Sequence, residues 1–119
     1  MRAPARPSAD NHRAVAEPLA ADLEERVRAV LDRRLVSEAE LRKLFEEGHA
    51  CALILGGLLD RCERELSVLA ADPDSSLADV ADAVRAVNEL RPQLDDLHGL
   101  LARLEERARE LRAAWLAPP

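Results

Sequence analysis

The C-terminal part of the chain carries apolar residues at alternating intervals of three and four, beginning at Leu94. This spacing averages 3.5 residues, so the apolar side chains stay on one face of a helix, as they do in the seams of coiled coils. It therefore predicts a long helix that packs lengthwise against another helix. The residues of this stripe are Leu94, Leu97, Leu101, Leu104, Ala108, Leu111 and Trp115.

A second long helix is predicted over residues 38–71, which precede the heptad-patterned helix in the sequence. Ser37 and Glu40 have the spacing of a capping box, in which the serine accepts from a backbone N–H and the glutamate reaches back. The segment Asp72-Pro73-Asp74-Ser75 favours a turn, because residues before proline avoid the helical conformation. Helices over 38–71 and 76–116 should therefore form an antiparallel hairpin, with a kink or break near Pro92.

A shorter helix is predicted over 18–35, beginning at Pro18, and residues 1–17 are predicted to be a flexible tail. Composition supports the helices: 48% of residues are hydrophobic but only 2% are aromatic, so strand-forming side chains are scarce. We therefore expect an all-α fold with one helical domain over 18–117. We expect a three- to four-helix bundle, a coiled-coil-like hairpin plus the shorter helix, completed by oligomerisation; a monomeric three-helix bundle is the alternative.

The stretch from Ala50 to Leu59 is apolar around most of its helix, which predicts burial on several sides. The pair Gly56-Gly57 within it suggests close approach of another helix, and a kink in the middle of the helix is the alternative. Two helices and a short third one leave part of this surface uncovered, so we predict an interaction surface there and along the C-terminal seam. Its residues are Leu53, Ile54, Leu58, Leu59, Leu97, Leu101, Leu104, Leu111 and Trp115.

Charge argues against nucleic acid as the partner. The net charge is −6, and the arginines alternate with carboxylates instead of clustering. No apolar run approaches the roughly 20 residues that a bilayer requires, and no secretory signal is visible, so a cytoplasmic location is expected. Cys51 and Cys62 are interpreted as reduced, buried thiols, although interchain pairing or metal binding is also open to them.

Two acid-x-x-His motifs offer an alternative function. Glu46 and His49 share one helix face, and Asp95 and His98 share another, as metal ligands do in di-iron helical bundles. If the hairpin turns between Pro73 and Asp74, His49 and His98 lie at the same level. A site of this kind would bind iron or another transition metal.

The sequence contains no phosphate-binding loop, dinucleotide fingerprint or nucleophile elbow, so we expect no enzyme activity and no cofactor. The main prediction is a helical protein–protein interaction module, namely an adaptor, a small chaperone or an assembly subunit. It would act through its Leu, Val and Ala seams, on a helical partner or on copies of itself.

Overall fold

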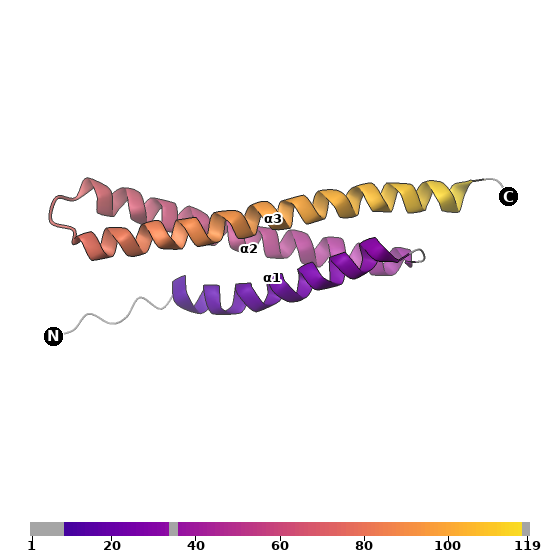
Figure 1. Cartoon of the computed structure of the whole chain (residues 1–119), viewed down its shortest axis with the longest axis horizontal. Helices are drawn as coiled ribbons and strands as arrows, with labels where there is room; N and C mark the ends of the chain where they lie inside the picture. Colours follow the sequence, from indigo (N-terminus) through magenta and orange to yellow (C-terminus); the bar gives the residue numbers. More distant parts are fainter. Residues whose placement is uncertain (1–8, 34–35, 118–119) are drawn as a thin grey trace.

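The computed structural model describes residues 9–33 and 36–117, and for residues 9–20 only the backbone. It contains three helices, α1 (Ala9–Asp32), α2 (Glu38–Ala71) and α3 (Leu77–Leu116). Helices α2 and α3 form a long antiparallel hairpin, and α1 lies against both of them (Figure 1). The all-α hairpin with a shorter N-terminal helix is therefore confirmed.

Helix α1 begins earlier than the sequence predicts. Residues 9–17, assigned to the flexible tail, are helical, and the helix continues through Pro18 to Asp32. Proline removes one backbone donor but does not by itself end a helix, and the good helix formers Ala14, Ala16 and Glu17 precede it. The rest of the predicted tail, residues 1–8, and the predicted helix end at Leu35 lie outside the described residues.

The turn of the hairpin is held by Asp72. Its side-chain Oδ1 accepts from the backbone N–H of Asp74 at 2.9 Å, and its carbonyl accepts from Ser75 at 3.1 Å. An aspartate that bonds the backbone two residues ahead stabilises a turn on its own. The predicted turn at 72–75 is therefore confirmed, with its hydrogen bonds assigned.

Serine residues cap both helices of the hairpin. Ser37 Oγ accepts from the N–H of Glu40 at 3.1 Å, and Ser76 Oγ accepts from the N–H of Asp79 at 3.0 Å. The second half of the predicted capping box differs, since the Glu40 carboxylate lies 3.6 Å from the Arg33 guanidinium instead of turning back to Ser37. The ion pair links α2 to the end of α1.

Pro92 does not split the third helix. Helix α3 runs without interruption from Leu77 to Leu116, about 60 Å at 1.5 Å per residue. Pro92 is exposed, whereas Leu90 and Leu97 on either side of it are buried. The proline ring and the carbonyl that loses its donor therefore lie on the solvent side, where water can satisfy that carbonyl.

The core is a single apolar cluster along the three helices. The helices approach closely at Gly48, because a Cβ built there would overlap the Leu101 side chain of α3. The predicted register sets His49 opposite His98. The Gly48–Leu101 contact and the Glu38–Arg112 and Glu63–Arg91 ion pairs show that the two helices are shifted from that register by two to seven positions. The largest fully buried side chains are Val27, Leu41, Leu55, Leu90, Leu97 and Leu104.

Arg107 of α3 closes the C-terminal end of α1. Its Nη2 donates to the Arg33 carbonyl at 2.9 Å, and its Nη1 donates to Glu110 at 3.1 Å. The last carbonyls of a helix have no partner within the helix, and α1 has no basic residue in its own last turn. Arg107 supplies that missing charge and donor from a distant part of the sequence.

We expect Arg107→Met to lower the free energy of unfolding by about 1 kcal/mol, because the α1 carbonyl loses a charged donor. Amide exchange should also become faster in the last turn of α1. The matched control is Arg103→Met, which removes an exposed arginine from the same helix and should change stability by less than about 0.5 kcal/mol. Equal losses for the two variants would show that the cap contributes nothing.

Glu38 at the start of α2 is bound by Arg112 near the end of α3. Arg112 Nη2 and Nε donate to its two carboxylate oxygens at 2.6 and 3.2 Å. This hydrogen bonding holds the pKa of Glu38 below its ordinary value. A depressed folded-state pKa stabilises the fold above the unfolded-state pKa, and this stabilisation is lost as the pH falls through the folded-state value.

Arg112→Met should therefore raise the pKa of Glu38 toward that of an unpaired glutamate, which an NMR titration of the labelled carboxyl carbon measures directly. Arg109→Met removes an exposed arginine from the same turn region and should leave the titration unchanged. A Glu38 pKa that does not move in Arg112→Met would show that the pair does not persist in solution.

Candidate functional site: an exposed apolar face of α2

The structure divides the predicted interaction surface into two groups. Six of its residues lie inside the chain's own core, so the prediction that they face a partner is wrong for this fold. Their side chains pack between the three helices, because the apolar stripe of α3 is buried within the hairpin itself. These six are Leu58, Leu59, Leu97, Leu101, Leu104 and Leu111, all 8% exposed or less.

Three of the predicted surface residues are exposed: Leu53 at 78%, Ile54 at 45% and Trp115 at 45%. Trp115 lies near the end of α3, close to the exposed Leu116. Leu53 and Ile54 lie in the middle of α2, far from any helix end, where fraying cannot explain their exposure. The middle of α2 is therefore the strongest candidate for a contact surface.

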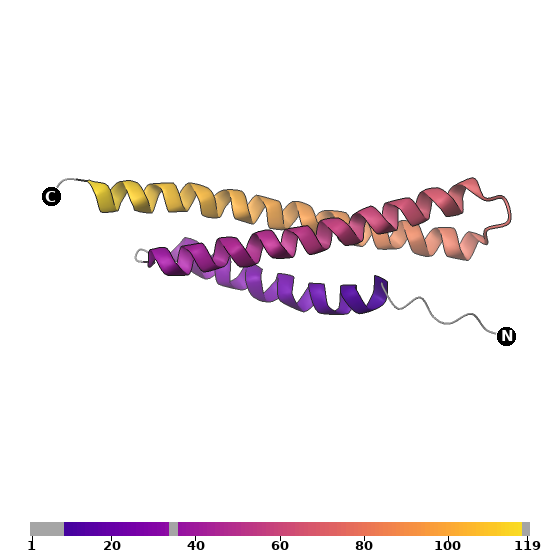
Figure 2. The same cartoon turned by 180° about the vertical axis from the view of Figure 1, so that it is seen from behind.

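Ala50, Leu53, Ile54 and Gly57 form one continuous strip, which we call the α2 apolar face. Their spacing of three, four and seven residues places them on one side of the helix, away from the buried residues Gly48, Leu55 and Leu59. No charged residue occurs between Glu47 and Asp60. Figure 2 shows α2 nearest to the viewer, with α1 beside its N-terminal half.

The glycine pair does not mark a contact within the chain. A Cβ built on Gly56 or Gly57 meets nothing within 4 Å, so no other helix of this chain approaches closely at this pair. The close contact between α2 and α3 occurs instead at Gly48, on a different side of α2 from Gly57. Gly57 is left on the exposed side, where the absence of a side chain keeps the helix backbone accessible between Leu53 and Arg61.

Two shallow hollows lie on either side of Ile54. One, of about 330 Å³, is formed with α1 and lined by Asp22, Leu23, Arg26, Glu47, Ala50, Cys51 and Ile54. The other, of about 240 Å³, is lined by Leu53, Ile54, Gly57, Leu58 and Arg61. Alternating ridges and hollows of this size are the surface relief into which side chains of another helix pack.

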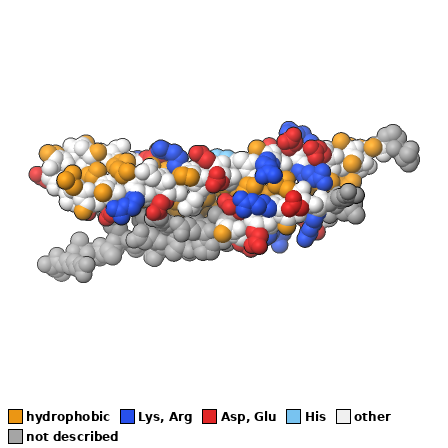
Figure 3. Space-filling view, viewed as in Figure 1, with side chains coloured by type: hydrophobic (Ala, Val, Ile, Leu, Met, Phe, Trp, Pro, Cys, Tyr) orange, Lys and Arg blue, Asp and Glu red, His pale blue; other side chains and the backbone are white. Residues whose placement is uncertain are grey.

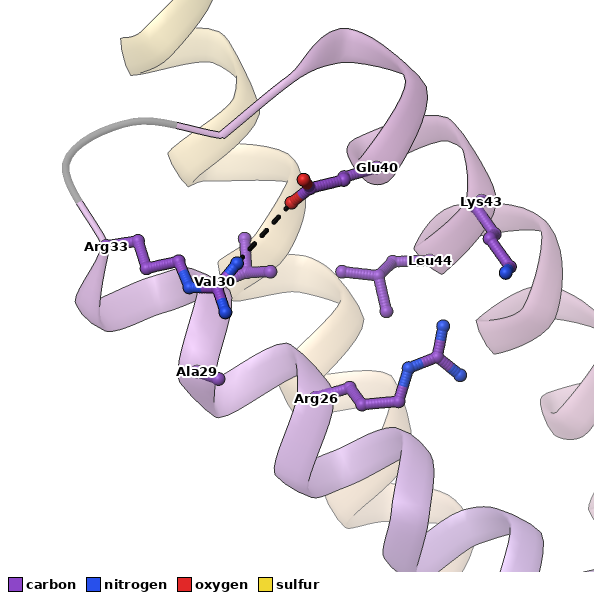
Figure 4. A pocket seen from close by; sticks show the side chains of 7 residues that line it. All are labelled: Arg26, Ala29, Val30, Arg33, Glu40, Lys43 and Leu44. Carbon is purple, nitrogen blue, oxygen red and sulfur yellow. Dashed lines mark ion pairs between the residues drawn. The ribbon is translucent and has the colours of Figure 1, made fainter.

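A second candidate is a pocket of about 270 Å³ between the end of α1 and the start of α2 (Figure 4). Three cations line it, but two of them already have carboxylate partners. Arg26 is paired with Glu47 and Asp22, whose hydrogen bonds and charges raise its pKa, and Arg33 is paired with Glu40. These pairs tie α1 to α2, so the pocket is part of the helix junction.

The acid-x-x-His motifs do not form a cluster. Glu46, His49, Asp95 and His98 are all exposed. No group of three or more potential ligands that could hold a metal occurs in the described ranges 9–33 and 36–117. The His49 ring instead stacks on Phe45 of the preceding turn, with centroids 6.2 Å apart.

Cys51 and Cys62 lie in the core, each with 7% of its surface exposed, as the interpretation as small hydrophobes predicts. Burial, together with the nearby Glu24 carboxylate, raises the pKa of the Cys51 thiol. A raised pKa keeps the thiol protonated at neutral pH, which disfavours nucleophilic or metal-binding chemistry.

The remaining surface is mixed in charge. In Figure 3 acidic and basic side chains alternate over the C-terminal half of α3, and hydrophobic groups gather at the hairpin turn, where Leu77 and Val68 are exposed. No helix in the described part of the chain has the length and apolar character needed to cross a bilayer.

Comparison with known proteins gives no match to a family model, to a curated protein or to a solved structure.

Proposed function

We propose that this chain is a non-enzymatic helical interaction module whose working contact is the α2 apolar face. The observation that carries the proposal is the exposure of Leu53 and Ile54 in the middle of α2, away from both helix ends. Exposing a leucine forgoes about 1.5–3 kcal/mol of burial energy, so an unpartnered pair at this position leaves apolar surface for a binding partner.

The shape of the face favours a helix as the partner. The strip follows the axis of α2, the hollows beside Ile54 can receive side chains, and Gly57 permits close approach of a backbone. A partner peptide that binds as a β-strand requires an open sheet edge, and the secondary-structure elements of the described residues are all helices. Adaptors, small chaperones and assembly subunits are the classes of protein that this mode of binding fits.

Photo-crosslinking in the cells that produce the chain tests the proposal. A photoreactive residue at position 53 should give an adduct of discrete mass, and Ile54→Glu in the same chain should abolish it. The matched position is Asn88, which is exposed on α3. No adduct from position 53, or the same adducts from positions 53 and 88, would contradict the proposal.

A further inference from the structure

We infer that α1 is a releasable cover, which opens from the α2–α3 hairpin as one unit while the hairpin stays folded. Its opening enlarges the α2 apolar face, because apolar side chains next to that face lie beneath α1. The inference goes beyond the proposed function, since it concerns a contact within the chain and stands whether or not a partner binds.

The hairpin extends beyond the reach of α1. The two ion pairs between α1 and α2 lie in one antiparallel register, in which Ala9, the first residue of α1, is level with Arg64 of α2. Both views of the chain show α1 ending short of the hairpin turn (Figures 1 and 2). At that level the Glu63–Arg91 ion pair joins α2 to α3 at 3.0 Å, and closer to the turn Ala83 is still only 9% exposed. The hairpin therefore has contacts of its own that do not require α1.

The charged contacts that hold α1 in place are half-exposed. Arg26 pairs with Glu47 of α2, each side chain being 38% exposed, and Arg33 pairs with Glu40 at 3.6 Å, with side chains 58% and 53% exposed. The third contact is the exposed hydrogen bond from Arg107 to the Arg33 carbonyl. Ion pairs in such positions contribute little to stability, because water and salt screen them.

The apolar contact of α1 is small because the helix is short. Among its described side chains, which begin at residue 21, the buried ones are Leu23, Val27 and Val30. Residues 9–20 add only Val15 and Leu19 as large apolar side chains in the sequence. By comparison, α2 and α3 bury eight and nine residues. Because the cost of opening rises with the apolar surface exposed, α1 should open at a lower free energy than the hairpin.

The α2 residues beneath α1 border the α2 apolar face. Cys51 is 7% exposed there, and burial, followed by the Glu24 carboxylate of α1, raises the pKa of its thiol. The hollow between α1 and α2 is lined by Cys51 together with Ala50 and Ile54 of the face and Leu23 of α1. Release of α1 therefore joins Cys51 to the face and widens the apolar surface that a helix could contact.

The reaction of the Cys51 thiol with Ellman's reagent measures the opening, in a chain that carries Cys62→Ala so that one thiol reacts. At reagent concentrations where the rate is proportional to the reagent, the rate reports the population of the open form. Arg26→Glu replaces the ion pair with Glu47 by a repulsion, so Cys51 should react about fivefold faster. Adding Glu47→Arg to that variant should bring the rate back toward that of the original chain.

Arg91→Glu is the matched control, because it makes the same reversal in the Glu63–Arg91 pair within the hairpin, whose side chains are similarly exposed. It should change the rate at Cys51 by less than about twofold. A second reporter is Ala83→Cys in a chain with both native cysteines replaced by alanine, since residue 83 is buried without α1. Arg26→Glu should leave the rate at this thiol unchanged, and circular dichroism checks that each variant is folded.

Faster reaction at Cys51 alone, in Arg26→Glu alone, supports the inference. It is overturned if Arg91→Glu accelerates Cys51 as much as Arg26→Glu does, or if the thiols at positions 51 and 83 respond together, because α1 then opens only when the whole chain unfolds. An unchanged rate in Arg26→Glu also overturns it. These rates are measured on the purified chain, so the absence of a crosslink from position 53 would contradict the proposed function and leave this inference standing.

Discussion

Leu97→Ala is expected to lower the free energy of unfolding by about 3 kcal/mol. Leu97 is fully buried in the seam of α3 and belongs to the cluster that joins the three helices. Truncation to alanine removes its contacts and leaves a cavity that close-packed helices fill only partly. The loss should be seen in chemical denaturation monitored by circular dichroism, as a lower midpoint with an unchanged slope.

Leu77→Ala is the matched control for this substitution. Leu77 is the first residue of the same helix and is 88% exposed, so the identical truncation should cost less than about 0.5 kcal/mol. The contrast tests the placement of the seam and not merely the presence of leucine. A loss at Leu77 as large as that at Leu97 would mean that the hairpin packs in a different register.

Gly48→Val is expected to destabilise the fold by about 2 kcal/mol. A Cβ at position 48 overlaps the Leu101 side chain, which is itself 4% exposed and has little room to move. The helices must separate or Leu101 must leave its rotamer, and either response disturbs the core along the hairpin. Thermal or urea denaturation of the purified variant measures the loss.

The same substitution at Gly56 should have the opposite sign. A Cβ there meets nothing within 4 Å, and valine costs slightly less than glycine in a helix. Gly56→Val should therefore leave the free energy of unfolding unchanged or raise it by a few tenths of a kcal/mol. If Gly48→Val were also neutral, the helices would not approach each other at Gly48.

The helices and their junctions could be predicted from the sequence because each depends on local chemistry. Ser37 and Ser76 cap the helices through their own hydroxyl groups, and Asp72 holds the turn through its own carboxylate. The heptad stripe of α3 likewise determines which of its sides is buried. Such features require no knowledge of the rest of the chain.

Features that depend on two helices at once could not be predicted in the same way. Successive residues of a helix point in directions about 100° apart, so the position of α3 decides whether it packs against Gly48 or against Gly56-Gly57. The apolar stretch 50–59 does not indicate on which side of α2 the helix α3 lies. Arg107 reaches the end of α1 only because the hairpin brings it there. No spacing within α3 indicates that role.

The candidate site shows the same division. Leu53 and Ile54 were identified from the surplus of apolar residues, whereas Ala50, Gly57 and Arg61 were not included in the predicted surface. They could have been found by asking which residues share a helical face opposite the buried stripe. The six predicted residues that proved to be buried fill the space between α1, α2 and α3. The apolar stripe of each hairpin helix packs against the other helix of the same hairpin before it can contact a partner.

The central claim is that another helix covers the α2 apolar face in the working protein, and side-chain footprinting with hydroxyl radicals tests it most directly. Leu53 and Ile54 should be oxidised readily in dilute purified chain and several-fold less in intact cells, where the partner is present. Leu77 and Leu116, which are 88% and 85% exposed, should be oxidised equally in both conditions. Equal oxidation of Leu53 in the two conditions would contradict the account.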